Sequence, residues 1–241
     1  MTTLVVGASG ATGQLLVQQL LDRGEQVRII VRSTQNLPDE ITNHDNLTLI
    51  QASIVDLSDS ELVQYVSGCS AVASCLGHTL SFKGILGPPY RLVTDTTQRL
   101  CRAVKTVGGN EPVKFVLMNT TGNSNRDLEE KISFGQKCVI VLLRLLLPPH
   151  ADNENAADYL RTRIGQNDGA IEWAVVRPDT LVNESEKSEF VVHCSPIRSA
   201  IFDTGLTSRI NVACFMADLI CDDRTWTQWK GMMPVIYNRD V

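Results

Sequence analysis

The stretch Gly7-Ala8-Ser9-Gly10-Ala11-Thr12-Gly13 decides the fold, because it stands between a short apolar run and a helical pattern. Residues 3–6 suit a buried strand, and residues 11–23 place apolar side chains at helical spacing up to Gly24, where a helix C-terminal glycine belongs. Glycines spaced GxxGxxG allow a tight turn and a close approach to a pyrophosphate, which helix N–H groups then bind. The hydroxyls of Ser9 and Thr12 add donors. The stretch therefore predicts a dinucleotide-binding turn rather than one that only joins strand to helix.

Strand-like runs alternate with helical patterns through the first half of the chain. The expected strands are residues 3–6, 26–31, 47–52, 71–75 and 114–118, and the expected helices are 11–23, 62–66 (capped by Ser58) and 90–107. This alternation is typical of βαβ units, whose right-handed crossovers build a parallel sheet with helices on both faces. We expect an α/β, Rossmann-type doubly wound parallel sheet.

The second half of the chain is less regular. It predicts one or two helices over 127–147, helices over 151–166 and 211–221, and strands over 172–176, 189–194 and 232–237. The apolar run 139–147 predicts a buried helix, with a wall for a flavin or hydrophobic substrate as the alternative. Neither a repeat nor a linker divides the chain. We expect a single NAD(P)-binding domain over 1–241, with residues from about 178 onward forming a small substrate-side lobe.

Composition excludes several classes of protein. Of 241 residues, 43% are hydrophobic and 20% charged, which excludes intrinsic disorder. The net charge of −5 disfavours phosphate backbones, so we expect no nucleic-acid partner. The longest apolar run contains Arg144 and falls short of the ~20 residues of a membrane span, so we expect no membrane partner.

Cysteine and histidine usage bears on compartment and metals. The seven cysteines include no CxxC pair and predict buried, reduced thiols in a cytoplasmic protein, consistent with a start that shows no secretion signal. The four histidines show no metal-ligand spacing, so no metal site is predicted.

The end of the second strand indicates which dinucleotide would bind. An acidic residue about 20 residues past the loop would favour NAD(H), but Arg32 stands there, followed by Ser33. A guanidinium suits a 2′-phosphate, so the sequence favours NADP(H) over NAD(H). The alternative is a solvated arginine at a strand end.

The chain resembles the short-chain dehydrogenase/reductase superfamily, and within it the atypical branch of NmrA-like and flavin-reductase-like (biliverdin reductase B-like) proteins. The resemblance rests on GASGATG at residues 7–13, VRS at 31–33, Cys75-Leu76-Gly77, FVLMNTTG at 115–122 and VVRPDTL at 175–181. It implies a Rossmann-type fold and an NADP-binding oxidoreductase.

The resemblance also implies roles for particular residues. The pyrophosphate would lie on Gly7, Ser9, Gly10, Ala11, Thr12 and Gly13, the 2′-phosphate on Arg32, and the adenosine ribose beside Leu76 and Gly77. Thr120 falls at the family's active-site Ser or Thr, with Thr121 adjacent. Residues 177–180, including Pro178, would approach the nicotinamide. Ser53 replaces the family's Asp near the adenine.

The main departure from the family concerns catalysis. Conventional members use Tyr-x-x-x-Lys for proton transfer, but His150 and Glu154 occupy those positions here. His150, with Asp152 two residues on, is a candidate acid; the alternative is a histidine at a helix start with Asp152 as the cap.

The leading expectation is an NADPH-dependent oxidoreductase that passes hydride to a small-molecule acceptor of flavin or quinone type. Such acceptors tolerate weak proton delivery, which suits a site without the Tyr/Lys pair. Two alternatives remain: a non-catalytic NADP(H)-sensing regulatory protein that binds a protein partner, and a relative of sugar-nucleotide epimerases or dehydratases.

Overall fold

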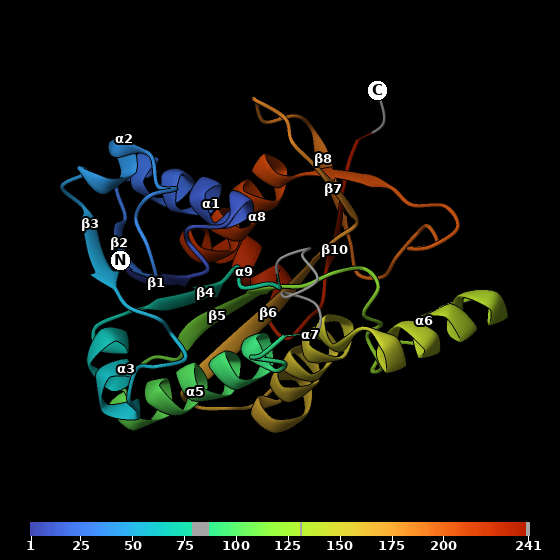
Figure 1. The fold of residues 1–241 in the computed structure, drawn as a ribbon, viewed down its shortest axis with the longest axis horizontal. Helices are drawn as coiled ribbons and strands as arrows, with labels where there is room; N and C mark the ends of the chain where they lie inside the picture. Colours follow the sequence, from blue (N-terminus) through green and yellow to red (C-terminus); the bar gives the residue numbers. More distant parts are fainter. Residues whose placement is uncertain (79–86, 131, 240–241) are drawn as a thin grey trace.

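The computed structural model describes residues 1–78, 87–130 and 132–239. Within these residues, eight strands form one sheet in the order β3-β2-β1-β4-β5-β6-β10-β8 (Figure 1). The strands are β1 (Thr2–Val6), β2 (Gln26–Val31), β3 (Leu47–Gln51), β4 (Ala71–Ser74), β5 (Val113–Met118), β6 (Ile171–Pro178), β8 (Phe190–His193) and β10 (Val235–Asn238). All neighbours are parallel except β8, which runs antiparallel to β10. The strand order reverses between β1 and β4, so the predicted Rossmann-type doubly wound sheet is confirmed.

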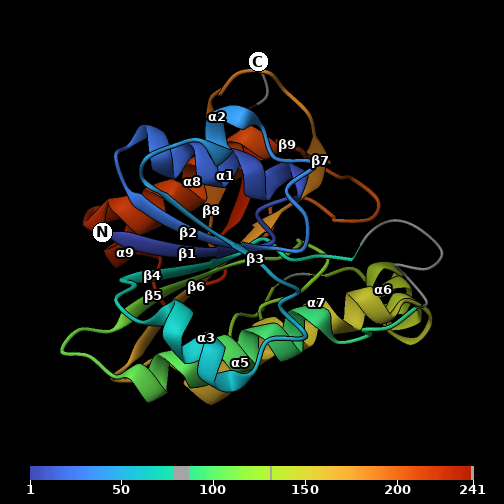
Figure 2. The same ribbon diagram turned by 60° about the vertical axis from the view of Figure 1, so that its left-hand side comes forward.

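Helices cover both faces of the sheet (Figure 2). One face carries α1 (Ala11–Asp22), α8 (Arg209–Cys221) and α9 (Asp223–Trp229), and the other carries α3 (Asp59–Val66), α5 (Leu92–Val107) and α7 (Pro148–Tyr159), which the π-helix Leu160–Ile164 continues. The remaining elements are α2 (Asp39–Thr42), α6 (Phe134–Leu146) and a separate pair of short parallel strands, β7 (Thr180–Val182) and β9 (Leu206–Ser208).

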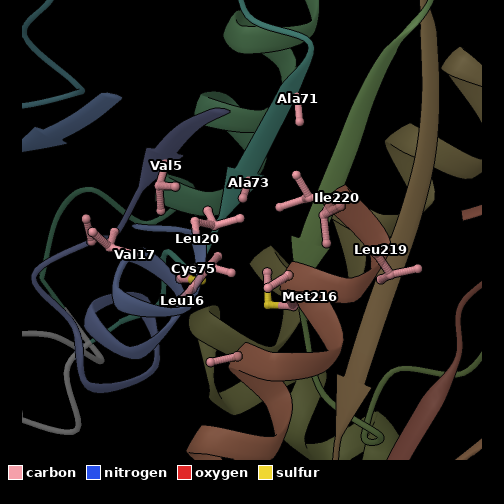
Figure 3. Close-up of a cluster of buried hydrophobic side chains, with 14 of the residues drawn as sticks. Val5, Leu16, Val17, Leu20, Ala71, Ala73, Cys75, Met216, Leu219 and Ile220 are labelled. Carbon is pink, nitrogen blue, oxygen red and sulfur yellow. The ribbon is translucent and has the colours of Figure 1, made fainter. Parts of the chain in front are cut away.

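Strand alternation divides the core into two clusters. Val5 of β1 faces α1 and α8, whereas Leu4 and Val6 face the cluster on the other side. Figure 3 shows the first cluster, in which Leu16 and Leu20 of α1 meet side chains of α8 over the small residues of β4. Central strands are apolar on both faces because helices bury both of them.

The predicted elements of the sheet are confirmed, since each of the eight expected strands lies in it. The predicted cap of α3 is also confirmed, because the Ser58 hydroxyl accepts the Glu61 N–H and the Glu61 carboxylate accepts the Ser58 N–H. The short elements α2, α9, β7 and β9 were not predicted. Elements of three or four residues (α2, β7 and β9), and of seven in α9, carry too little periodicity to separate a strand or a helical turn from a loop.

The prediction of a buried helix over 139–147 is wrong. The run does form most of α6, but Val141, Leu142, Leu145 and Leu146 are exposed, and only Gln136 and Ile140 of this helix are buried. In Figure 1 the helix extends away from the sheet. Residues 127–130, expected to begin the helix, form turns instead.

The cysteine prediction is partly wrong. All seven cysteines lie within the described residues and are free thiols, but Cys138 and Cys194 are exposed. Burial raises the pKa of the Cys75 thiol to about 12, so this residue packs in the core as expected rather than serving as a reactive thiol. Among the described helices, none combines the length and the apolar character that crossing a membrane requires.

Candidate functional site

The glycine loop joins β1 to α1 at the point where the strand order reverses. Gly7 has φ +76°, and a Cβ there would lie 2.5 Å from the carbonyl carbon of Cys75. A Cβ on Gly13 would lie 2.1 Å from the oxygen of Gly7. Backbone therefore contacts backbone at both positions, and only glycine fits.

Free N–H groups point out of this loop. The amides of Ala11, Thr12 and Gly13 begin α1, so they have no intrahelical acceptor, and no other acceptor exists for them among the described residues. Gln14, which the sequence did not single out, holds the loop in place by donating from Nε2 to the carbonyls of Ser9 (3.1 Å) and Asn36 (2.6 Å). The loop therefore presents unpaired amides at a helix N-terminus, the arrangement that suits an anion.

A cavity of about 310 Å³ opens beside the glycine loop. Six of the predicted cofactor-binding residues line it: Gly7, Ser9, Gly10, Arg32, Leu76 and Gly77. Ser53 also lines it, together with Asn36, Val55 and Leu92, which the sequence did not indicate because loop and helix contribute them from separate segments. The predicted residues Ala11, Thr12, Gly13 and Ser33 do not line this cavity. The hydroxyl of Thr12 is buried with its residue, and that of Ser33 accepts the Gln35 N–H.

Two arginines of β2 and its end differ in their surroundings. The Arg28 guanidinium donates to the carbonyls of Tyr65 and Ser67 and is therefore structural. The Arg32 guanidinium is exposed at the cavity, and nothing in the described part of the chain bonds to it. Arg32 is thus available to an anion in the cavity.

A second group of predicted residues lies beyond the ends of β5 and β6. The Thr121 N–H donates to the Pro178 carbonyl over 3.0 Å, so these two positions adjoin. The Thr121 hydroxyl is also bonded to the buried Asp179. Thr120 accepts the Gly122 N–H at Oγ1 over 3.2 Å. None of these residues lines the glycine-loop cavity.

His150 and Thr120, the two candidate catalytic residues, adjoin in the structure. A Cβ placed on Gly122 would lie 3.4 Å from His150 Cε1 and 3.6 Å from Thr120 Oγ1, so the imidazole and the hydroxyl both flank this glycine. The His150 Nε2 is buried without a hydrogen-bond partner among the described residues. This nitrogen has almost no accessible surface, so proton exchange with a ligand would require the imidazole or its neighbours to move.

Glu154, not Asp152, is the carboxylate that faces His150. Its Oε1 lies 3.7 Å from His150 Nε2, one helical turn along α7. Arg144 of α6 holds Glu154 with two hydrogen bonds of 2.6 and 2.8 Å. Burial lowers the pKa of His150; Glu154 counteracts this and Arg144 reinforces it.

Asp152 has a different role from the one expected. Its carboxylate accepts the N–H groups of Val93 (2.8 Å) and Thr94 (2.9 Å) at the start of α5, and it is 2.8 Å from His78 Nε2. It therefore caps α5 rather than its own helix, and it does not pair with His150. The sequence could not show this because 58 residues separate Asp152 from Thr94.

Arg177 also differs from the expectation. Its side chain is wholly buried, and its guanidinium donates to Glu130 Oε1 (2.7 Å), the Asn123 carbonyl (2.9 Å) and the Met233 carbonyl (2.7 Å). These bonds tie the loop after β5 to the segment just before β10, so the guanidinium has a structural role.

The fold and the site can now be compared with known proteins. A family profile described as NAD(P)H-binding matches residues 7–223, so the chain belongs to this NAD(P)H-binding family. No curated protein matches the chain in sequence.

Solved structures share the fold over nearly the whole chain. A short-chain dehydrogenase/reductase from Veillonella parvula in complex with NADP is 17% identical, with a TM-score of 0.70, and covers 98% of this chain and 94% of that one. ChuY, an anaerobilin reductase from Escherichia coli O157:H7, is 13% identical, with a TM-score of 0.70 and coverage of 100% and 98%. A Streptococcus pneumoniae protein proposed to be an NADH-flavin reductase is 16% identical, with a TM-score of 0.66 and coverage of 99% and 100%.

These comparisons confirm the resemblance predicted from the sequence. The chain has an NAD(P)H-binding fold of oxidoreductase type, and its structural neighbours are short-chain dehydrogenase/reductase and flavin-reductase-like proteins.

Proposed function

We propose that this protein is an NADPH-dependent oxidoreductase that passes hydride to a flavin- or quinone-like acceptor. The observation that carries the cofactor choice is the exposed Arg32 guanidinium, which lines the cavity and has no partner among the described residues. A guanidinium pairs with a phosphate through two parallel hydrogen bonds, and the 2′-phosphate is the group that separates NADPH from NADH.

The residues present fit the cofactor. The free amides of Ala11, Thr12 and Gly13, with Ser9 and Gly10, would hold the pyrophosphate, and Arg32 with Ser33 the 2′-phosphate. Leu76 and Gly77 would lie against the ribose. Thr121 and Pro178 would lie beside the nicotinamide. NADPH, when bound, supplies the hydride.

The character of His150 supports a conjugated acceptor over an alcohol or a sugar. Its pKa is lowered by burial, so the imidazole is mostly neutral near pH 7 and is a weak proton donor there. A flavin or quinone ring can take hydride first and a proton afterwards, from His150 or from solvent. Thr120 Oγ1, beside His150, would donate a hydrogen bond to a carbonyl of the acceptor.

The neighbours are consistent with this acceptor class. One is an anaerobilin reductase and another a proposed NADH-flavin reductase. At 13% and 16% identity they show the fold of this chain alone, so they support the proposal without fixing the substrate.

The cofactor is tested by titrating NADPH and NADH against intrinsic fluorescence. We expect tighter binding of NADPH, and Arg32→Glu should weaken it by ~10–100-fold, the equivalent of a hydrogen bond to a charged group. Arg224→Glu makes the same charge change on the exposed face of α9 and should leave binding unchanged. Equal affinities for the two dinucleotides in the parent would refute the assignment of Arg32.

The acceptor is tested by following NADPH oxidation with a panel of flavins and quinones. Thr120→Val and His150→Ala should each slow reduction while NADPH binding is retained, and a general acid typically contributes ~10²–10⁴-fold. Oxidation of secondary alcohols should stay near background. The absent Tyr/Lys pair also favours the second candidate, an NADP(H)-sensing protein, and a parent that binds NADPH tightly but reduces no acceptor would support it instead.

A further inference from the structure

The exposed side of α6 carries a stripe of apolar residues with no partner in the described structure. Phe134, Cys138, Val141 and Leu145 are all exposed, and Phe134 and Leu145 expose 82% and 76% of their surface. Their spacings of four, three and four residues are those of the seam positions of a coiled coil. We call these four residues the α6 stripe.

The stripe points directly away from the body of the molecule. At 100° per residue, its four members lie within a narrow sector, and the residues that contact the body, Gln136 and Ile140, lie on the opposite side. One face of α6 thus packs against the body of the molecule, and the stripe forms a second, apolar face that points away from it. A solvated helix would carry charged residues there.

We propose that the α6 stripe is a dimer interface and that its occupant is the α6 stripe of a second copy of this chain. A seam with these spacings is matched best by another helix with the same spacings, and a two-fold axis provides one. About an axis through the middle of the helix, Phe134 meets Leu145 of the other copy and Cys138 meets Val141. Large residues are then opposed to large ones, and small to small.

The apolar area agrees with a dimer. Leu142 flanks the stripe, and Phe202 lies against Gly135 at its start; both are exposed. At such exposures each side chain offers on the order of 100 Å², so the stripe and these two residues together offer roughly 600 Å² per copy, at the lower end of the ~600–1,000 Å² per partner of a standard interface. A monomer that exposed this continuous patch would be prone to aggregate.

Charge argues against a membrane as the occupant. Helices that lie on membranes carry several Lys or Arg on the polar face, whereas α6 has only Lys137 and Arg144. Glu154 already neutralises Arg144 with two hydrogen bonds. Pairing of two copies therefore brings no two uncompensated cations together along the seam.

The first test is the mass in solution, by sedimentation velocity or light scattering on the whole protein. The parent should behave as a dimer of the 26.5 kDa chain. Leu145→Glu should weaken association by ~100-fold or more, because it buries an unpaired charge in the seam. Leu146→Glu, which makes the same change on an exposed residue outside the stripe, should remain dimeric. A monomeric parent, or a dimer unaffected by Leu145→Glu, would overturn the proposal, as would a monomeric parent that floats with anionic phospholipid vesicles.

The second test is cross-linking under mild oxidation, in a Cys194→Ser background that removes the other exposed thiol. Val141→Cys should form a disulfide with Cys138 of the second copy, whereas Leu146→Cys should not. Cross-linking of Leu146→Cys with equal yield, or no cross-linking of Val141→Cys in a dimeric sample, would contradict the antiparallel pairing of the stripes.

Discussion

Gly7 and Gly24 show how one residue type serves two different needs. Both have positive φ, +76° and +77°, a region that glycine adopts without strain. Around Gly24 a Cβ would meet nothing within 4 Å, but at Gly7 it would collide with the backbone of Cys75 and Leu76. Gly24 is required by conformation alone. Gly7 is required by conformation and by the closeness of the backbone that follows β4.

This difference predicts unequal effects of the same substitution. Gly24→Ala should cost about 1 kcal/mol in the free energy of unfolding, the penalty of a left-handed alanine. Gly7→Ala should cost about 2–4 kcal/mol, because backbone must also move, and it should weaken dinucleotide binding. Urea unfolding of both variants measures the difference. Equal losses would show that the loop relaxes without cost and that the close approach to Cys75 is not rigid.

Individual site residues were predictable only where a local pattern fixes them. The glycine loop follows from strand, loop and helix in sequence, and Arg32 from its place at the end of β2. The roles of Arg144 and Gln14 were not predictable from the sequence. The groups they bond, Glu154 and the Asn36 carbonyl, come close to them only when the chain has folded. Asp152 was noticed but given the wrong partner for the same reason.

At the scale of elements, α5 depends on a cap supplied by α7. Three groups converge on the Asp152 carboxylate: two amides that begin α5, and His78, which lies four residues past the end of β4. The cap thus joins two helices to the segment that follows the cavity-lining residues Leu76 and Gly77. A cap within one helix could not link them.

Asp152→Ala should therefore lower the free energy of unfolding by about 1–2 kcal/mol, the usual effect of losing a cap. A more specific sign is amide exchange, which should accelerate at Val93 and Thr94, because their N–H groups lose their acceptors. Ser58→Ala removes the local cap of α3 and is the matched control, with faster exchange at Glu61 instead. If exchange at Val93 and Thr94 were unchanged in Asp152→Ala, the carboxylate would not be the cap of α5.

Elements were predicted well where periodicity and burial agree. The central strands β1, β4, β5 and β6 are apolar runs that helices cover on both faces, so sequence pattern and environment coincide. Helix α6 is the exception. An apolar run indicates that burial of its side chains is favourable, but it does not indicate what covers them. Its place outside the fold follows from the turn at 127–130 and from Arg144 reaching back to α7, neither of which has a local pattern.

For the molecule as a whole, acid should weaken the fold in two stages. Burial, opposed by Glu154 and reinforced by Arg144, holds the pKa of His150 below 6.5. At Asp168, burial is outweighed by Lys105 and by backbone N–H groups, so its pKa lies below 3.8. In both cases the unfolded chain binds more protons than the folded one, so stability falls as pH falls. Burial raises the pKa of Asp179, which acts in the opposite direction and offsets part of the lower stage.

The upper stage can be assigned to a single residue. In urea unfolding at a series of pH values from about 8 to about 3, the parent should lose stability as the pH falls through about 6.5, because protonation is then favoured in the unfolded chain. His150→Gln removes the titrating group, so this upper stage should disappear while the decline at lower pH remains. His44→Gln, a half-buried position before β3, should keep both stages. Two outcomes would contradict this assignment: a parent equally stable from about pH 8 to about pH 5, or a His150→Gln variant that still loses stability near pH 6.5. In either case the site would not hold the imidazole neutral. The choice of a conjugated acceptor, which depends on weak proton delivery by His150, would then need another explanation.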